Sequence, residues 1–462
     1  MDSSSAAGTR PLAEPAIAHF AASLRGALLR PGEPGYDAAR HLYNAMIDRR
    51  PALIARCAGP EDVAAGVAFA REHGLLLSIR GGGHNVAGSA LCDGGLVLDL
   101  SGMRAVHVDP EARTARAEGG ATWGDFDRAT QAHGLATTGG AISSTGIAGL
   151  TLGGGLGMLM RKHGLTCDNL LAADVVLADG RRVRASEAEE PDLFWALRGG
   201  GGNFGAVTAF EYRIHPRGPV LAGSVFYPFE KAREFLHVYR DLTASAPDDL
   251  TLYAILLHTP DGAPAVGLQI CHAGEHDEGR RLLRPLDKLG APIAGGFGPT
   301  PYVEMQCSLD AAFPSGLLNY WKSNFLRALS DDAIDGLIDR FRAVPSPLPI
   351  IMLEHLGGAV SRVPHGTTAF CHRETPYNLF IVSRWTEPAA TGAHVAWARD
   401  LWGAMERFSA GGVYVNYLGE EESARVPSAY GASYARLAEL KRRYDPTNLF
   451  RVNQNVSPAK AA

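Results

Sequence analysis

Ser78-Ile-Arg80-Gly-Gly-Gly83-His84-Asn85 is the most informative stretch of the 462-residue chain, because a short apolar strand runs there into three glycines and a histidine. Glycine has no Cβ, so successive backbone N–H groups in such a loop can approach and bind a pyrophosphate. A single loop histidine is usually just hydrogen-bonded, yet a deprotonated imidazole is also a competent nucleophile. The stretch therefore predicts a phosphate-bearing ligand, and leaves the role of the histidine to other motifs.

A second glycine-rich stretch covers residues 138–157 and reads TGGAISSTGIAGLTLGGGLG. It is too rich in glycine for a core helix and too apolar for a flexible linker. Backbone lying against a flat, bulky ligand explains both properties, with serine and threonine hydroxyls available to phosphates. Together the two stretches predict a dinucleotide site.

A GxGxxG pattern at Gly200, Gly202 and Gly205 points at first sight to a Rossmann fold. In that fold the fingerprint follows a strand and opens a helix. Here residues 193–198 read as a helix before the glycines, and residues 206–214 alternate like a strand after them. The order is reversed, so the predicted dinucleotide site is not of the Rossmann type.

The composition is that of an ordinary globular protein, with 46% hydrophobic residues, 20% charged residues and a formal charge of −5. This balance argues against a nucleic-acid partner, because phosphate contacts need a basic surface. No apolar run approaches the roughly 20 residues that cross a bilayer, and the first residues carry no secretory signal. The six cysteines lie far apart without a CxxC pair, which favours reduced, packed thiols over disulfides or a metal site. We therefore expect a cytoplasmic enzyme that holds no metal and contacts no membrane.

The chain is expected to be α+β, with two domains. The sequence pattern changes near residues 215–219. Beyond them, strands that contain Tyr and Phe alternate with helices, as in an antiparallel sheet covered by helices on one face. The predicted units are a disordered N-terminus (1–12), a first domain (13–215), a second domain (216–412) and a C-terminal segment (413–462). Expected elements include helices within 13–29 and over 60–73, 122–134, 229–245, 278–289 and 434–444, and strands over 52–57, 75–80, 96–99, 105–108, 114–118, 174–177, 182–185, 221–227, 250–257 and 265–271.

Motifs in the same order along the chain resemble those of the FAD-linked oxidases with the vanillyl-alcohol oxidase fold. Residues 80–85 resemble the motif by which these enzymes attach flavin to a histidine, and residues 153–169 and 193–205 resemble their next two signatures. Residues 414–417 and 444–455 resemble the C-terminal signatures of the berberine bridge enzyme branch. The bacterial 6-hydroxynicotine oxidase type is nearest in length and motif spelling.

This resemblance implies a two-domain PCMH-type fold, in which the C-terminal segment returns to the FAD-binding domain. It also implies FAD held covalently through His84. The plant enzymes add a second bond from a cysteine just upstream of their GGG, but residues 142–148 here contain none, and Cys167 lies downstream of Gly155. We therefore expect a single covalent bond, with Cys167 packed in the core. The implied FAD-binding residues are His84, Arg80, Gly81, Gly82, Gly83, Asn85, Gly140, Ser143, Gly146, Gly149, Gly153, Gly154, Gly155, Asn169, Gly205, Val207 and Asn453.

The family chemistry implies that a substrate C–H delivers hydride to the flavin while a base removes a proton from the adjacent O–H or N–H. Glu354 is one candidate base, because a carboxylate inside the apolar run 350–356 is costly to bury without a purpose. Tyr414 and Asn416 belong to the Tyr-x-Asn signature that lies over the flavin in the family, which makes Tyr414 a rival base. Lys322 is a candidate to line the pocket on the substrate side, and each of these residues could equally be structural.

The expected electron acceptor is dioxygen, which is reduced to hydrogen peroxide. The expected substrate is a small organic molecule such as a secondary metabolite. A dehydrogenase or a redox-neutral cyclase with the same fold is the alternative, followed by a non-catalytic flavin-binding protein. Aromatic residues of the second domain, among them Tyr253, Trp321 and Phe380, hint at a ring-bearing substrate. A homodimer is compatible with the sequence, which contains nothing that requires one.

Overall fold

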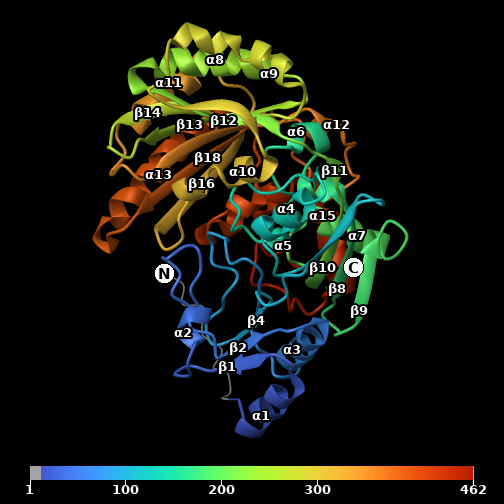
Figure 1. Ribbon diagram of the computed structural model, residues 1–462. Helices are drawn as coiled ribbons and strands as arrows, with labels where there is room; N and C mark the ends of the chain where they lie inside the picture. The colour runs from blue at the N-terminus through green and yellow to red at the C-terminus, as the bar shows by residue number, and fades with distance from the viewer. Residues whose placement is uncertain (1–11, 461–462) are drawn as a thin grey trace.

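The computed structural model describes residues 12–460, so the predicted disordered N-terminus lies outside the described residues except for Leu12. A small sheet in the order β1-β2-β4-β3 opens the chain, with β2, β4 and β3 parallel (Figure 1). Its buried strands pack against two helices, as expected for parallel strands covered on their faces. The elements are α1 (Glu14–Ser23), β1 (Ala27–Leu29), α2 (Tyr36–Ala39), β2 (Leu53–Arg56), α3 (Pro60–Glu72), β3 (Leu77–Arg80) and β4 (Leu96–Asp99).

The expected helix within residues 13–29 is only partly correct, because α1 ends at Ser23 and Ala27–Leu29 forms strand β1. Pairing with β2 causes the change, since a Cβ at Gly26 would lie 1.8 Å from the Arg56 carbonyl oxygen. The Asp62 carboxylate also accepts from the Gly26 N–H at 3.0 Å. Contacts with distant residues thus override the local helical pattern.

A five-stranded antiparallel sheet in the order β5-β6-β10-β8-β9 follows, and β8 and β9 form the predicted hairpin. Helix α4 begins at a capping box, where the Thr122 hydroxyl and the Asp125 carboxylate exchange hydrogen bonds with each other's backbone N–H. The elements are β5 (Val106–Asp109), β6 (Thr114–Glu118), α4 (Trp123–Gln131), β7 (Leu135–Ala136), α5 (Ile147–Leu152), α6 (Met160–His163), β8 (Leu170–Val176), β9 (Arg182–Ser186), α7 (Pro191–Leu197), β10 (Ala206–Arg213) and β11 (His215–Pro216).

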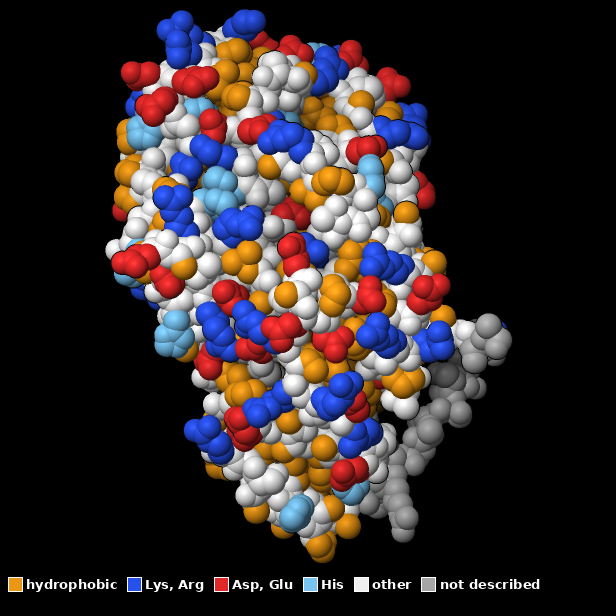
Figure 2. Space-filling model, turned by 90° about the vertical axis from the view of Figure 1, so that its right-hand side faces the viewer, with side chains coloured by type: hydrophobic (Ala, Val, Ile, Leu, Met, Phe, Trp, Pro, Cys, Tyr) orange, Lys and Arg blue, Asp and Glu red, His pale blue; other side chains and the backbone are white. Residues whose placement is uncertain are grey.

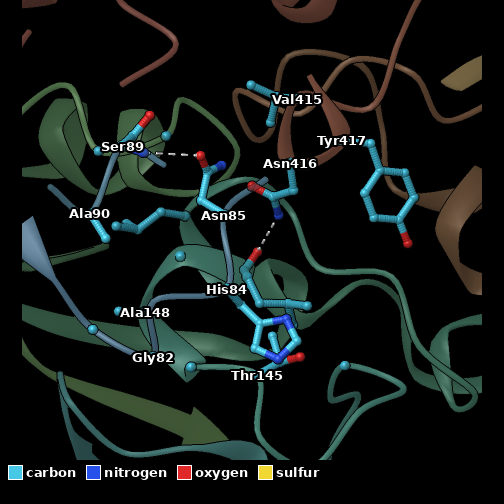
Figure 3. A pocket seen from close by; sticks show the side chains of 18 of the residues that line it. Gly82, His84, Asn85, Ser89, Ala90, Thr145, Ala148, Val415, Asn416 and Tyr417 are labelled. Carbon is cyan, nitrogen blue, oxygen red and sulfur yellow. Dashed lines mark hydrogen bonds between the residues drawn. The ribbon is translucent and has the colours of Figure 1, made fainter. Parts of the chain in front are cut away.

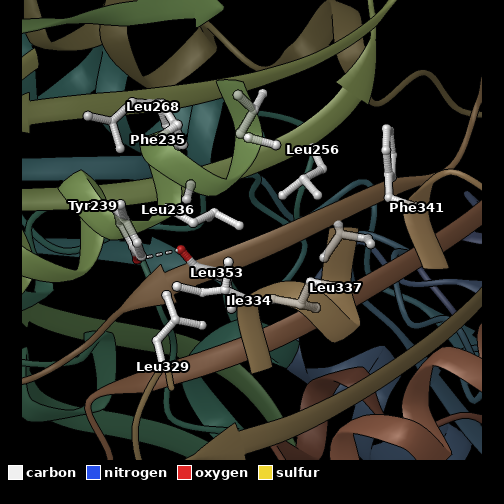
Figure 4. Close-up of a cluster of buried hydrophobic side chains, with 14 of the residues drawn as sticks. Phe235, Leu236, Tyr239, Leu256, Leu268, Leu329, Ile334, Leu337, Phe341 and Leu353 are labelled. Atoms are coloured by element: carbon white, nitrogen blue, oxygen red, sulfur yellow. Dashed lines mark hydrogen bonds between the residues drawn. The ribbon is translucent and has the colours of Figure 1, made fainter. Parts of the chain in front are cut away.

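The second half of the chain builds a seven-stranded sheet in the order β15-β12-β14-β13-β17-β18-β16, antiparallel throughout. Helices α8, α11 and α13 pack on its outer face, where Phe235, Leu256, Ile334 and Leu353 share one core (Figure 4). The predicted antiparallel sheet with helices on one face is confirmed. The elements are β12 (Val220–Pro228), α8 (Ala232–Ala244), β13 (Leu250–His258), β14 (Pro264–His272), α9 (His276–Leu282), β15 (Ala294–Thr300), α10 (Tyr302–Cys307), β16 (Leu318–Leu326), α11 (Asp331–Phe341), β17 (Ile350–His355), α12 (Ala359–Arg362), β18 (Tyr377–Trp385) and α13 (Thr391–Met405).

From Val413 the chain runs back to the first half, where α14 (Val426–Tyr430) and α15 (Tyr434–Tyr444) share a core with α7 and β10. The buried Lys441 ammonium fixes this return, because it pairs with Asp445 at 2.6 Å and donates to the Asn203 and Phe450 carbonyls. A short 3-10 helix, Val415–Tyr417, precedes these helices. The C-terminal segment thereby packs against both halves of the chain.

All six cysteines are free, and four of them are buried, as predicted. Across residues 12–460, no helix combines the length and the apolar character needed to cross a membrane. The face in Figure 2 carries basic and acidic side chains interspersed, without a continuous basic patch.

Candidate active site

A long cavity lies between the inner face of the seven-stranded sheet and the glycine loops of the first half. Figure 3 shows Asn416 and Tyr417 on one side of it and Gly82, His84 and Thr145 on the other. Its walls thus combine segments that are several hundred residues apart in the sequence. The predicted site residues that line it are Gly81, Gly82, Gly83, His84, Asn85, Gly140, Gly146, Gly149, Gly205, Val207, Glu354, Tyr414, Asn416 and Asn453.

The two glycine stretches touch each other at the floor of the cavity. A Cβ on Gly82 would lie 2.4 Å from the Gly146 nitrogen, so neither position tolerates a side chain without movement of the backbone. Gly83 has a φ of +67°, a conformation that other residues rarely adopt. The glycines are therefore required by close backbone packing, which leaves bare backbone facing the cavity.

His84 stacks on the Tyr43 ring, with the ring centroids 4.0 Å apart, and its Nε2 lies 2.9 Å from the Ser144 hydroxyl. Burial lowers the pKa of His84 to about 4, so the imidazole is neutral at pH 7 and keeps a free lone pair. The neighbouring Ser143 is held by Asp310, whose carboxylate accepts from its N–H at 2.8 Å and from its hydroxyl. A residue of the second domain, Asp310, thus stabilises the loop beside the histidine by hydrogen bonds.

Glu354 lies on β17 with only 3% of its surface exposed, and it faces the cavity. Its carboxylate accepts from the Asn378 amide at 2.6 Å and from the Tyr417 hydroxyl at 3.0 Å. Burial raises the pKa of Glu354 to about 7, outweighing these two donors. A carboxyl group with a pKa near neutrality is suited to accept a proton at physiological pH.

The raised pKa of Glu354 also predicts how stability changes with pH. The folded state holds this proton more tightly than the unfolded chain, so the contribution is complete below the usual pKa near 4.5 and is lost as pH rises through about 7. We expect Glu354→Gln to remove this loss. Between pH 5 and pH 8, its free energy of unfolding should rise relative to wild type by up to about 3 kcal/mol. Denaturant unfolding at both pH values measures the difference. An equal effect of the substitution at pH 5 and pH 8 would contradict the raised pKa.

Tyr414 is a poor base in this geometry, although it lines the cavity. Its hydroxyl oxygen accepts from the Asn416 amide at 2.8 Å and from the backbone N–H groups of Gly155 and Leu156 at 3.1 and 3.4 Å. Burial also raises the pKa of Tyr414 well above its usual value, so it stays a neutral phenol with its lone pairs occupied. Asn416 packs tightly against Gly153, where a Cβ would lie 2.2 Å from the amide oxygen. Both residues therefore hold the glycine turn in place.

Lys322 was predicted on the substrate side, and this is wrong. Side chains alternate along a strand, so Trp321 points into the cavity and Lys322 points to the helix-covered face. There the ammonium pairs with Glu421 at 2.9 Å and with Glu422 at 3.1 Å. Lys322 is thus a buried structural cation.

We expect Lys322→Met to keep its FAD and to retain turnover close to wild type. Stability should fall by about 1–3 kcal/mol, because Glu422 stays buried with Arg425 as its remaining cation. Urea unfolding and steady-state rates measure the two effects. A large loss of turnover at unchanged stability would return Lys322 to the reaction.

Several predicted FAD contacts do not line the cavity. The Arg80 guanidinium turns away and donates to the backbone carbonyls of Ala39 and His41. The Asn169 amide donates to the carbonyls of His163 and Leu165, which closes a local turn. These two side chains therefore stabilise the loops around the cavity by hydrogen bonds to backbone carbonyls and do not face the cavity. The residues absent from the lining are Arg80, Ser143, Gly153, Gly154, Gly155 and Asn169.

Other cavity residues were not assigned a role from the sequence. Tyr417 belongs to the signature at residues 414–417. Its hydrogen bond to Glu354 is not predictable from the sequence, because the two residues lie 63 positions apart. Tyr43 carried no signal, because it belongs to no motif. Gly201 and Gly202 line the cavity as well, within the GxGxxG run. That run lies between α7 and β10, which confirms that it is not a Rossmann fingerprint.

Comparison with known proteins agrees with this site. The chain matches the family models for the FAD binding domain over residues 51–186 and for berberine and berberine-like proteins over residues 413–457. It is 33% identical to (R)-6-hydroxynicotine oxidase of Paenarthrobacter nicotinovorans, over 94% of this chain and 97% of that protein. It is 29% identical to xylooligosaccharide oxidase of Thermothelomyces thermophilus, over 90% and 89% of the two chains.

Among solved structures, 6-hydroxy-D-nicotine oxidase from Arthrobacter nicotinovorans has a TM-score of 0.88 at 30% identity. The similarity covers 97% of this chain and 100% of that one. Both matched family segments also contribute residues to the cavity, through the glycine loops and through Tyr414–Tyr417. The chain therefore belongs to the berberine bridge enzyme-like family of FAD-dependent oxidases, and it has the two-domain PCMH-type fold that its motifs predict.

Proposed function

We propose that the protein holds FAD through a single covalent bond to His84 and oxidises a C–H next to an O–H or N–H of a small organic molecule. The observation that carries this proposal is the pairing, in one cavity, of a neutral His84 with a buried Glu354 whose pKa is near 7. When bound, FAD supplies the hydride acceptor and passes the electrons to dioxygen, which leaves as hydrogen peroxide.

The residues around the cavity suit FAD in shape and chemistry. Bare glycine backbone from residues 81–83 and 146 faces the cavity, where N–H groups can bind a pyrophosphate. The described lining contains no lysine or arginine, so backbone N–H groups would bind the pyrophosphate. Asn453, Gln454 and the Gly201–Gly202 pair extend the same wall.

His84 would form the only covalent bond. Its Nε2 contact with Ser144 fixes the ring, and a proton on Nε2 would leave the lone pair on Nδ1. Cys167 is fully buried in an apolar core, and burial raises the pKa of its thiol, so it is no second nucleophile. The upstream stretch 142–148 contains no cysteine.

Glu354 would act as the base that takes the substrate O–H or N–H proton as the C–H bond breaks. Asn378 and Tyr417 fix the carboxylate by donating to both of its oxygens. Tyr414 and Asn416 act indirectly, by holding the turn at Gly153–Leu156.

The proposal also includes a secondary metabolite as substrate, a homodimer and a cytoplasmic location, the last supported by six free cysteines.

Oxygen uptake and peroxide formation by the purified yellow protein test this function against a panel of amines and alcohols. Equal amounts of substrate oxidised and peroxide formed would support an oxidase. Flavin bleaching that persists in air would identify a dehydrogenase, and conversion of substrate without net electron transfer would identify a redox-neutral cyclase. Absence of yellow colour would favour a protein without catalytic flavin.

A further inference from the structure

The second domain, together with Tyr417 of the C-terminal segment, lines one wall of the cavity with aromatic and aliphatic side chains. Phe380 and Tyr417 stack with their ring centroids 3.8 Å apart, and the Trp321 indole meets Phe380 edge-on at 5.0 Å. Such a wall offers flat apolar surface and few hydrogen bonds. The residues of this wall are Tyr253, Leu309, Phe313, Trp321, Met352, Phe380 and Tyr417.

Two polar side chains of this wall lie directly opposite each other on neighbouring strands. Tyr253 on β13 is the register partner of Glu354 on β17. The Tyr253 side chain is 0% exposed and lines the cavity, and its hydroxyl has no hydrogen-bond partner in the described part of the chain. Buried hydroxyls are normally satisfied, so this one is available to a molecule bound in the cavity.

The charges of the cavity restrict what it can accept. Glu354 is the only acidic residue in the described lining, and no lysine or arginine stands there to pair with an anion. A carboxylate or phosphate in this wall would be desolvated beside another carboxylate. An ammonium group would instead meet Glu354 and the faces of aromatic rings.

We infer that the substrate is a compact, ring-bearing amine or alcohol, neutral or cationic, with one polar atom at Glu354 and a second bound by the Tyr253 hydroxyl. The inference rests on the proposed function and names its substrate class. Oligosaccharides are excluded, because each buried sugar hydroxyl needs a partner that this wall does not provide. Tyr253 is thus a specificity-determining residue.

Calorimetric titration of the holoenzyme tests the inference with four probes: 4-hydroxybenzylamine, benzylamine, 4-hydroxybenzoate and cellobiose. We expect the two amines to bind and the acid and the sugar to give no heat of binding. The hydroxylated amine should bind about tenfold more tightly than benzylamine, and Tyr253→Phe should abolish this difference. Tyr227→Phe, which removes a hydroxyl from the helix-covered core, should retain it.

Tighter binding of cellobiose or 4-hydroxybenzoate than of the amines would overturn the substrate class, as would failure of both amines to bind. An unchanged preference in Tyr253→Phe would overturn the role of that hydroxyl. With dioxygen excluded and the flavin reduced beforehand, the titration measures binding without turnover. If the amines bind but no bleaching or peroxide is found with any ring-bearing amine or alcohol, the proposed oxidation fails while this inference stands.

Discussion

His84→Ala is expected to release all of its flavin into the supernatant on acid precipitation, whereas the wild-type pellet stays yellow. The reason is that, in the proposed function, the neutral His84 imidazole beside the glycine loop is the group that bonds to the cofactor. Bare backbone at Gly82 and Gly146 is unchanged in the variant, so FAD should still bind, without a covalent bond. Absorbance of pellet and supernatant, together with the mass of the intact protein, measures the result.

Cys167→Ala serves as the matched control, because it removes the cysteine that follows the Gly153–Gly155 run. Its flavin should stay in the pellet, since Cys167 is buried away from the cavity lining. Flavin that remains attached in His84→Ala would contradict the single bond through the histidine. A colourless wild-type pellet would leave only a non-covalent FAD site.

Glu354→Gln should lower turnover by about 10²–10⁴-fold while the flavin content stays normal, the range typical of a lost general base. The amide keeps nearly the same shape, and Asn378 can turn its own amide over to meet it, because its Oδ1 has no partner. Wild-type kcat/KM should rise with pH through about 7 as the carboxyl group ionises. The variant should lack this rise. Rates from pH 5 to pH 9, with flavin absorbance as a loading control, measure both effects.

Glu304→Gln removes an exposed carboxylate on α10 and should leave the rate and its pH profile unchanged. Unaltered turnover in Glu354→Gln, or a retained rise through pH 7, would exclude Glu354 as the base.

The sequence predicts much of the FAD-binding half, with Ala27–Leu29 as an exception. Runs such as Leu96–Asp99 and Tyr434–Tyr444 have the predicted bounds, because hydrophobic periodicity and flanking glycines report local structure. The glycine loops were likewise readable, since bunched glycines are needed where two backbones touch, as at Gly82 and Gly146. The order of the motifs along the chain identifies the family.

The tertiary structure alone decided which side chains meet. It turned Ala27–Leu29 into a strand by pairing it with β2, and it sent Lys322 to the opposite face from Trp321. It joined Glu354 to Tyr417. These outcomes depend on strand register and on contacts between distant segments, which local patterns do not encode. The sequence thus determined the cofactor class and the fold, while packing between the domains decided which groups reach the substrate.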